Sequence, residues 1–170
     1  DEFDQFCKMY SEIKLPFWCQ TRIETIDEEK FRTLKDVGMD RITFGLEHGN
    51  EDFRREVVKR EYSNVDAIAK MRIADKIGIP YSINNIIGFP DETRELIFDT
   101  IELVRKLKSN DINAFTFIPY QGTSLRGLCE TKNYLNKDTL ASIYETDSLL
   151  NMPSISKKEI GGLVKTFPLY

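Results

Sequence analysis

The sequence predicts an α/β fold, in which a parallel sheet of about four strands with flanking helices is followed by a helical C-terminal extension. Short apolar runs, rich in aromatic and β-branched residues, alternate with amphipathic stretches along most of the chain. The amphipathic stretches begin at side chains that cap helices, and this alternation is typical of consecutive βα units. It fades after Tyr120, so we expect one domain over residues 1–120 and the helical extension over 121–170.

The strands are predicted where apolar residues cluster between turn residues. Pro16 precedes the first strand, and Gly88 with Pro90 stops the third. The expected strands cover residues 17–22, 41–47, 81–87 and 114–120. A complete TIM barrel has eight strands and typically about 250 residues, whereas this chain has 170. We therefore expect an incomplete TIM-like barrel.

The helices are predicted from caps and from apolar residues at helical spacing. Asp27, Ser63, Thr93 and Ser156 are placed to cap helices, and Gly38 fits the position after a helix end. The expected helices cover residues 3–13, 28–37, a short stretch from 51, 64–77, 94–107, 138–150 and 156–165. The last two would form the extension.

The chain begins at Asp1 rather than at a methionine, and we expect it to be a fragment of a longer protein. A partial barrel leaves an edge of its sheet open, and an open edge favours pairing with another chain. We therefore expect that two copies can form a homodimer through that edge.

The composition argues against several classes of protein. The net charge of −4 offers no general attraction for nucleic acid or for an anionic membrane. No apolar run approaches the roughly 18 residues of a membrane span. Cys7, Cys19 and Cys129 are widely separated, which argues against a disulfide framework and for a reducing, cytoplasmic location. They have no local metal-ligand spacing, and His48 is the single histidine, so no metal site is expected.

Polar residues gather at the predicted strand ends, which is where βα folds bind their ligands. Gln20 and Arg22 end the first strand, Glu47 ends the second, and Asn84 and Asn85 lie near the end of the third. One of the two asparagines could serve a ligand hydroxyl while the other bonds a loop.

The alternation of side chains along the second strand separates two faces. Those expected to point to the helices are Ile42, Phe44 and Leu46. Those expected to point into the barrel interior are Thr43, Gly45 and Glu47. Because Gly45 lacks a side chain, it would let a flat ligand approach the backbone.

Ordinary structural explanations stand beside each candidate. Charged residues at strand ends often form ion pairs, amides bond neighbouring loops, and glycine or proline makes turns. These explanations apply to Arg22, Glu47, Arg60, Asn84, Asn85, Gly88 and Pro90. His48 is expected in a loop, without a catalytic role.

Three segments, in order, resemble strand-end motifs of the radical-SAM superfamily. They are residues 17–22, 41–50 and 84–90. The resemblance covers nearly the whole chain and is greatest to the group that often carries an N-terminal cobalamin-binding domain, whose third barrel strand ends in a motif similar to Asp1-Glu2-Phe3. It implies reductive cleavage of S-adenosylmethionine by a [4Fe–4S] cluster, which gives a 5′-deoxyadenosyl radical.

The resemblance also implies a set of residues that bind S-adenosylmethionine. Glu47 matches a position near the ribose or the amino-acid part, and Asn84 matches one that bonds ribose hydroxyls in some members. Arg60 matches an arginine that in some members pairs with the methionine carboxylate. The backbone of residues 87–90 matches an adenine-contacting segment. The implied cofactor-binding residues are Gln20, Arg22, Gly45, Glu47, Arg60, Asn84, Ile87, Gly88 and Pro90. No catalytic residue and no metal ligand is expected in this chain.

The family's C-x-x-x-C-x-x-C motif, which holds the cluster, is absent from the chain. Without thiolate ligands there is no cluster and no electron to cleave the cofactor, so we expect the chain alone to be inert. The full-length parent is expected to carry the [4Fe–4S] cluster, with cobalamin as a candidate further cofactor that this chain does not decide.

Two other functions stay open. A non-enzymatic α/β nucleotide-binding module that has lost the cluster would keep the same strand ends. Another TIM-barrel enzyme, such as an aldolase, is less favoured because no lysine ends a predicted strand. The expected partners are a small-molecule cofactor and a substrate that the sequence does not name, with neither nucleic acid nor membrane.

Overall fold

The computed structural model describes residues 1–109, 111–142, 145 and 147–170. Within them, four strands form one parallel sheet in the order β1-β2-β3-β4. The strands are β1 (Phe17–Arg22), β2 (Met39–Glu47), β3 (Tyr81–Ile87) and β4 (Asp111–Thr116). The α-helices are α1 (Glu2–Ile13), α2 (Glu28–Asp36), α3 (Glu51–Phe53), α4 (Asn64–Ile77), α5 (Arg94–Val104), α6 (Ser124–Thr131) and α7 (Lys157–Thr166). The shorter helical segments are η1 (Ile23–Thr25), the π-helical η2 (Arg54–Val58) and η3 (Phe167–Leu169).

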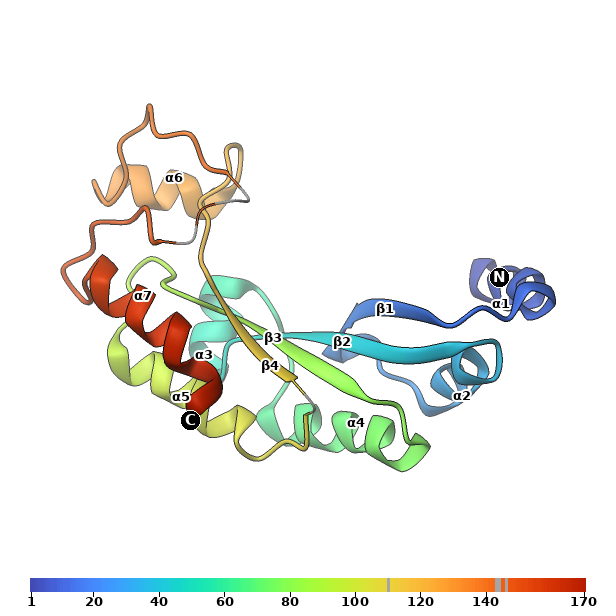
Figure 1. Cartoon of the computed structure of the whole chain (residues 1–170). Helices are drawn as coiled ribbons and strands as arrows, with labels where there is room; N and C mark the ends of the chain where they lie inside the picture. The colour runs from blue at the N-terminus through green and yellow to red at the C-terminus, as the bar shows by residue number, and fades with distance from the viewer. Residues whose placement is uncertain (110, 143–144, 146) are drawn as a thin grey trace.

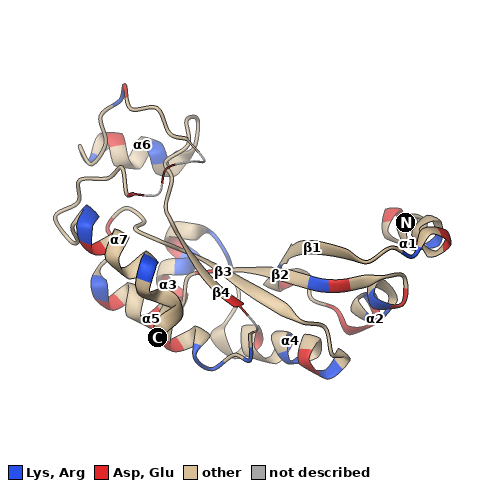
Figure 2. Ribbon diagram, in the orientation of Figure 1, with Lys and Arg blue, Asp and Glu red and all other residues tan. Residues whose placement is uncertain are grey.

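The sheet is open, and helices α2, α4 and α5 lie along one side of it (Figure 1). Helix α1 lies by the amino-terminal end of β1, away from α6 and α7. Charged residues of both signs are interspersed along the helices and loops (Figure 2). Among the described helices, none has the length and apolar character that a membrane span requires. The architecture is the predicted incomplete TIM-like barrel.

The helix-facing side of the sheet forms the hydrophobic core. Ile42, Phe44 and Leu46 of β2 are fully buried and belong to one cluster with apolar residues of α2, α4 and α5. The direction predicted for these three side chains is therefore confirmed. Gly45 and Glu47 line a cavity on the opposite side.

Capping side chains begin the helices where the sequence predicts them. The cap residues whose side-chain oxygens accept a backbone N–H from the first helical turn are Asp27, Ser63, Thr93 and Ser156. Each of them pairs an amide that the first turn leaves without an intrahelical acceptor.

The strand predicted over residues 114–120 is wrong in its bounds, because β4 spans Asp111–Thr116. It pairs in register with β3, and the ladder ends with Ile87 opposite Thr116. Beyond that point β3 offers no further residues, and Pro119 has no N–H to donate. The start of β4 was missed because its first residues are polar.

The helix predicted over residues 138–150 is also wrong. Its described residues form turns and irregular backbone, and residues 143, 144 and 146 lie outside the described part. The buried Arg126 explains the difference, because Nη2 donates to the carbonyl oxygen of Thr139 at 3.0 Å. A helix through this segment would need that carbonyl for its own ladder. The extension forms α6 earlier in the chain instead.

The C-terminal extension shares the core of the sheet. Leu150 and Ile160 are fully buried in the same cluster as the strand residues. Polar contacts join the extension to the loop between β3 and α5, since Asp91 accepts hydrogen bonds from Lys132 Nζ at 2.6 Å and from the Tyr134 hydroxyl at 2.7 Å. The extension is thereby fixed beside the carboxyl end of β3.

Gly49 brings the chain after β2 into direct contact with α5. Its N–H donates to Thr100 Oγ1 at 2.8 Å. A Cβ atom at this position would collide with backbone atoms of Asp99 and Thr100. Because a helix backbone cannot move aside as a side chain can, this close approach requires glycine.

We predict that Gly49→Ala lowers the free energy of unfolding by about 1–3 kcal/mol, the range for forcing an extra atom into a packed site. Gly162→Ala is the matched control, because a Cβ there meets nothing within 4 Å. Alanine should stabilise α7 by roughly 0.5–1 kcal/mol. Urea denaturation measures both effects, and equal midpoints for the two variants would contradict the packing at Gly49.

Candidate functional site

A cavity of about 1050 Å³ opens at the carboxyl ends of the four strands. Its walls come from all four strand ends, from the loop after η2 and from the C-terminal extension. The residues predicted from the sequence that line it are Gln20, Arg22, Gly45, Glu47, Arg60 and Asn84. In the loop after β3, Phe89 lines the cavity instead, while the predicted residues Ile87, Gly88 and Pro90 are buried within the described chain.

The register of the sheet places four residues in one row across its interior face. Arg22 pairs with Gly45, Gly45 with Asn84, and Asn84 with Asn113. Neighbouring strands lie about 4.8 Å apart, so the row spans roughly 14 Å. Residues distant in the sequence are thus brought within reach of one small ligand.

Arg60 is the centre of a network of charges beside this row. Its Nε and Nη2 atoms donate to Oε1 and Oε2 of Glu24 at 2.6 and 2.7 Å. Its Nη1 atom lies 3.5 Å from Oε1 of Glu47, and Nη2 lies 3.4 Å from the carbonyl oxygen of Gly45. A two-pronged arginine–carboxylate contact fixes orientation as well as distance. Arg60 therefore joins the chain after β1 to the end of β2.

Glu24 is a functional candidate that the strand-end pattern missed. It lies in η1, two residues after the end of β1, and so at the ligand-facing edge of the sheet. Extending the search for polar residues into the loops after each strand would have found it. Its pairing with Arg60, 36 residues away, has no local signal.

The two carboxylates of the network have pKa values shifted in opposite directions. Burial raises the pKa of Glu47 above its ordinary value, and the nearby Arg60 offsets only part of that effect. Burial acts in the same direction on Glu24, but the hydrogen bonds and charge of Arg60 outweigh it and hold its pKa below the ordinary value. Glu47, which faces the cavity, is therefore the carboxylate that takes up a proton more readily.

Glu47 owes its direction to an irregular end of β2. The register between β2 and β3 shifts between Gly45 and Glu47, and Glu47 has a left-handed φ of 66°. Bulges of this kind redirect a side chain at a strand end. The carboxylate lies over Gly45, where a Cβ atom would collide with it. Glu47 therefore lies beside Gly45, and both residues line the cavity.

Asn84 and Asn85 point to opposite sides of β3. Asn84 lines the cavity, and its Oδ1 accepts a hydrogen bond from Nδ2 of Asn113 at 3.3 Å. Asn85 is fully buried, and its Nδ2 donates to the carbonyl oxygen of Asn113 at 3.1 Å. Asn84 is therefore the one available to a ligand. Asn85 bonds a neighbouring strand rather than a loop.

The cavity has a polar side and an apolar side. Arg22 and Lys59 are exposed on the polar side, and within the described residues neither forms an ion pair. The apolar side is formed by β4, the segment that follows it and the extension, with Phe115, Phe117, Ile118, Leu125 and Val164. The arrangement suits a ligand with one charged end and a planar or apolar remainder.

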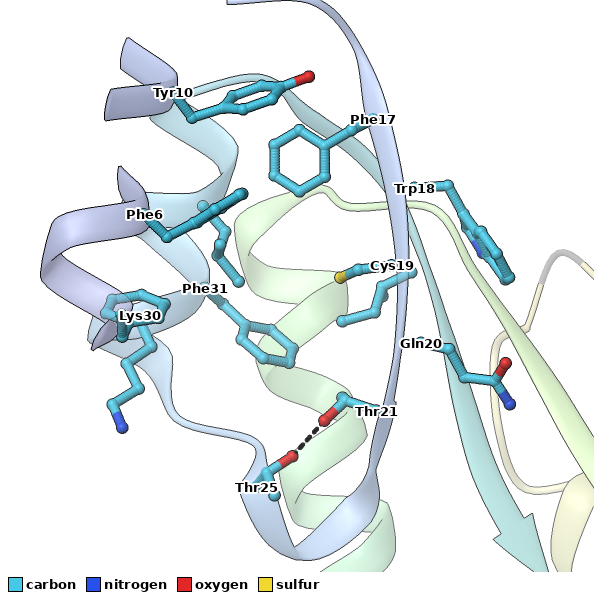
Figure 3. Close-up of a pocket in the computed structure, with 13 residues that line it drawn as sticks. Phe6, Tyr10, Phe17, Trp18, Cys19, Gln20, Thr21, Thr25, Lys30 and Phe31 are labelled. Carbon is cyan, nitrogen blue, oxygen red and sulfur yellow. Dashed lines mark hydrogen bonds between the residues drawn. The ribbon is translucent and has the colours of Figure 1, made fainter. Parts of the chain in front are cut away.

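A second cavity, of about 540 Å³, lies on the helix side of β1, between that strand, α1 and α2 (Figure 3). It is surrounded by the aromatic rings of Phe6, Tyr10, Phe17 and Phe31. Its lining also includes Thr21, whose hydroxyl forms a 2.5 Å hydrogen bond with the hydroxyl of Thr25. Beside it runs the edge of β1, which pairs with no strand in the described chain. It is an open part of the core rather than a ligand-facing edge.

The three cysteines lie on separate elements, Cys7 on α1, Cys19 on β1 and Cys129 on α6. Burial raises the pKa of all three thiols, to about 11 for Cys129, which disfavours the thiolate that a metal needs. Among the described residues, no group of three or more His, Cys, Asp or Glu side chains is arranged to hold a metal ion. An iron–sulfur cluster does not fit these residues.

Comparison with known proteins adds an independent observation. The family model of the Radical SAM superfamily matches residues 1–116. Biotin synthase of Persephonella marina is 32% identical over 129 residues, which cover 75% of this chain and 38% of that enzyme.

Two solved structures share the fold. The coproporphyrinogen III oxidase HemN of Escherichia coli, a radical SAM enzyme, has a TM-score of 0.63 at 18% identity, over 96% of this chain and 37% of that one. The second is the radical S-adenosylmethionine methyltransferase TsrM of Kitasatospora setae, solved with cobalamin and a [4Fe–4S] cluster. Its TM-score is 0.57 at 16% identity, and the match covers 66% of this chain and 22% of TsrM.

The chain spans less than two fifths of the length of the curated relatives that it matches. The family model, in contrast, covers most of this chain. With residues 1–116 of 170 matched, the chain belongs to the radical-SAM superfamily, whose cofactors are S-adenosylmethionine and a [4Fe–4S] cluster.

Proposed function

We propose that the cavity at the strand ends binds S-adenosylmethionine, and that the chain is the C-terminal portion of the barrel of a radical-SAM enzyme. The observation that carries the proposal is the convergence of Glu47, Arg60 and Asn84 on one cavity. Ligands of parallel βα folds bind at this edge of the sheet. The volume of about 1050 Å³ lies at the upper end of small-molecule sites, which leaves room for a substrate beside the cofactor.

The charges favour one orientation of the cofactor. The guanidinium of Arg60 already forms a two-pronged contact with the carboxylate of Glu24. A second such contact, with the cofactor carboxylate, would require the Arg60–Glu24 pair to separate. Arg22 and Lys59 are exposed at the same cavity and, within the described chain, unpaired. The methionine carboxylate therefore lies toward Arg22 and Lys59 in this proposal, and Arg60 acts by holding Glu47.

Glu47 and Asn84 suit the ribose and the amino group of the cofactor. A carboxylate accepts hydrogen bonds from hydroxyl or ammonium groups, and a side-chain amide both donates and accepts. Gln20 extends this polar wall, and Phe89 offers an apolar surface to the adenine. In this arrangement, Ile87, Gly88 and Pro90 support Phe89 from behind the cavity wall.

The residues of this chain bind and orient the cofactor but do not supply its electron. S-adenosylmethionine supplies a 5′-deoxyadenosyl radical when it is reductively cleaved. The cluster that reduces it would be held outside the described residues, because Cys7, Cys19 and Cys129 do not fit it. The chain alone is therefore proposed to be a catalytically inert fragment. Its full-length parent would carry the cluster, with cobalamin, which TsrM binds, as a candidate second cofactor.

In this proposal, the two parts of the chain have different roles. Residues 1–120 form the barrel portion, and residues 121–170 close one wall of the cavity, to which Leu125 and Val164 contribute. The edge of β1, where Trp18 is 56% exposed, is the surface through which two copies would dimerise. Three free cysteines suit a cytoplasmic location.

A second candidate function is a non-enzymatic nucleotide-binding module. This function is favoured because no set of side chains among the described residues is arranged to bind a metal ion. The nucleotide would bind in the same cavity. Anaerobic reconstitution of the full-length parent separates the two functions. An enzyme gives a bound cluster and 5′-deoxyadenosine, whereas a binding module gives neither.

We predict opposite effects of neutralising the two carboxylates. The folded pKa of Glu24 is lowered, so its stabilising contribution is complete above its ordinary value of 4.5 and is lost as the pH falls through the folded pKa. The folded pKa of Glu47 is raised, so ionising it opposes folding at neutral pH. At pH 7, Glu24→Gln should therefore lower the Tm and Glu47→Gln should raise it slightly. Both differences from the wild type should shrink between pH 7 and pH 3, and a lower Tm for Glu47→Gln than for Glu24→Gln at pH 7 would contradict the assignment.

We predict that Arg22→Gln weakens the binding of S-adenosylmethionine about tenfold, since a hydrogen bond to a charged group contributes roughly 1.5 kcal/mol. The affinity for 5′-methylthioadenosine, which lacks the carboxylate, should stay unchanged. Arg105→Gln, which removes an exposed partner of Glu102, is the matched control. Equilibrium dialysis of the chain measures all of these affinities.

Two outcomes of that measurement contradict the account in different ways. An equal loss of affinity for both ligands in Arg22→Gln would contradict the orientation of the carboxylate. The absence of any binding of S-adenosylmethionine by the wild-type chain would contradict the proposed site itself.

A further inference from the structure

A buried pair of side chains joins the ends of β2 and β3 behind the cavity. His48 follows Glu47 directly, and Glu92 lies in the loop after β3. Both side chains are fully buried, with Nε2 of His48 2.8 Å from Oε1 of Glu92. Glu47 ends β2 and Phe89 lies in the loop after β3, and both of these residues line the cavity.

Glu92 sets the path of the loop with its second oxygen. Oε2 accepts hydrogen bonds from the backbone N–H groups of Gly88 and Phe89, at 2.5 and 3.0 Å. Together with the imidazole of His48, three hydrogen-bond donors offset the free-energy cost of burying the Glu92 carboxylate. The turn that ends β3 is therefore built around this carboxylate.

The hydrogen bond at Nδ1 of His48 shows which of the two ring nitrogens carries the proton. The backbone N–H of Asn50 donates to Nδ1 at 3.1 Å. An amide N–H only donates, so Nδ1 carries no proton and Nε2 does. His48 is thus a neutral imidazole that donates through Nε2 to Glu92.

The surroundings hold the imidazole in place. The rings of Phe53 and Phe89 lie 4.5 and 6.3 Å from it. The buried Arg54 donates from Nη1 to the carbonyl oxygen of His48 at 2.6 Å, and its Cζ lies 4.0 Å from the centre of the Tyr62 ring. A side chain so packed transmits a displacement of one loop to the other.

We propose that His48 and Glu92 are positioning residues for S-adenosylmethionine, because their hydrogen bond fixes Glu47 at the end of β2 relative to Phe89 at the end of β3. The inference rests on the proposed function, since both positioned residues line the cavity assigned to the cofactor. A buried polar pair need not add stability, because its desolvation cost can cancel its attraction. Ligand affinity, rather than stability, is the property that the pair controls.

The tautomer can be tested in the wild-type chain, because His48 is its single histidine. Long-range ¹H–¹⁵N spectra of the imidazole report which nitrogen carries the proton. The expected result at neutral pH is a single tautomer protonated at Nε2. A tautomer protonated at Nδ1, or averaging between the two as in free imidazole, overturns the inference.

Substitutions test the effect on the ligand. Glu92→Gln keeps the shape of the side chain but removes the carboxylate, and it should weaken S-adenosylmethionine binding about tenfold, since small displacements of positioning groups have large effects. Glu159→Gln, which removes the exposed partner of Arg94, is the control and should leave the affinity unchanged. His48→Gln can still donate to Glu92 through its amide and should keep the affinity that His48→Leu loses.

Amide resonances separate this inference from the proposed function. The amide signals of Glu47 and Phe89 should both shift in Glu92→Gln, whether or not a ligand binds. Neither signal should shift in Glu159→Gln. If the wild type binds no S-adenosylmethionine, the proposed function fails, and these shifts still decide whether the pair couples the two strand ends. A folded Glu92→Gln with unchanged affinity and unshifted signals overturns the inference, as does an equal loss of affinity in His48→Gln and His48→Leu. Should Glu92→Gln not fold, the His48 variants and the imidazole spectrum decide.

Discussion

Parallel pairing of the four strands is the constraint from which the site follows. It brings Arg22, Gly45 and Asn84 into one row, although they lie far apart in the sequence. Because all four strands run in the same direction, the loops that follow them gather at one edge of the sheet. The position of the cavity is therefore a consequence of topology. Its chemistry depends on which residues end each strand.

The loops at this edge are tied together by partnered polar groups. Arg60 binds Glu24 after β1 and approaches Glu47 at the end of β2, while Glu92 after β3 binds His48 after β2. The first and last of these contacts each join residues that follow two different strands, so together they hold neighbouring strand ends to each other. The strand ends are thus connected to one another, as the supporting contacts of a precise binding site require.

Sequence patterns predicted the elements whose determinants are local. The bounds of β1 and β3 agree residue for residue, and the helix caps agree because a cap is completed within three residues. The bounds of β4 and the irregular segment after α6 depend on contacts with β3 and with Arg126, which no local pattern contains. For the same reason the strand-end rule found Glu47 and Asn84 but not the pairing of His48 with a carboxylate 44 residues away.

A crystal structure of the chain with S-adenosylmethionine is the most direct test of the central claim, that one cavity at the carboxyl ends of the strands recognises the whole cofactor. The account predicts the ribose or amino group within hydrogen-bond distance of Glu47 and Asn84, and the carboxylate toward Arg22. A cofactor bound instead in the apolar cavity beside β1, or bound at the strand ends without contact to these three residues, would contradict it.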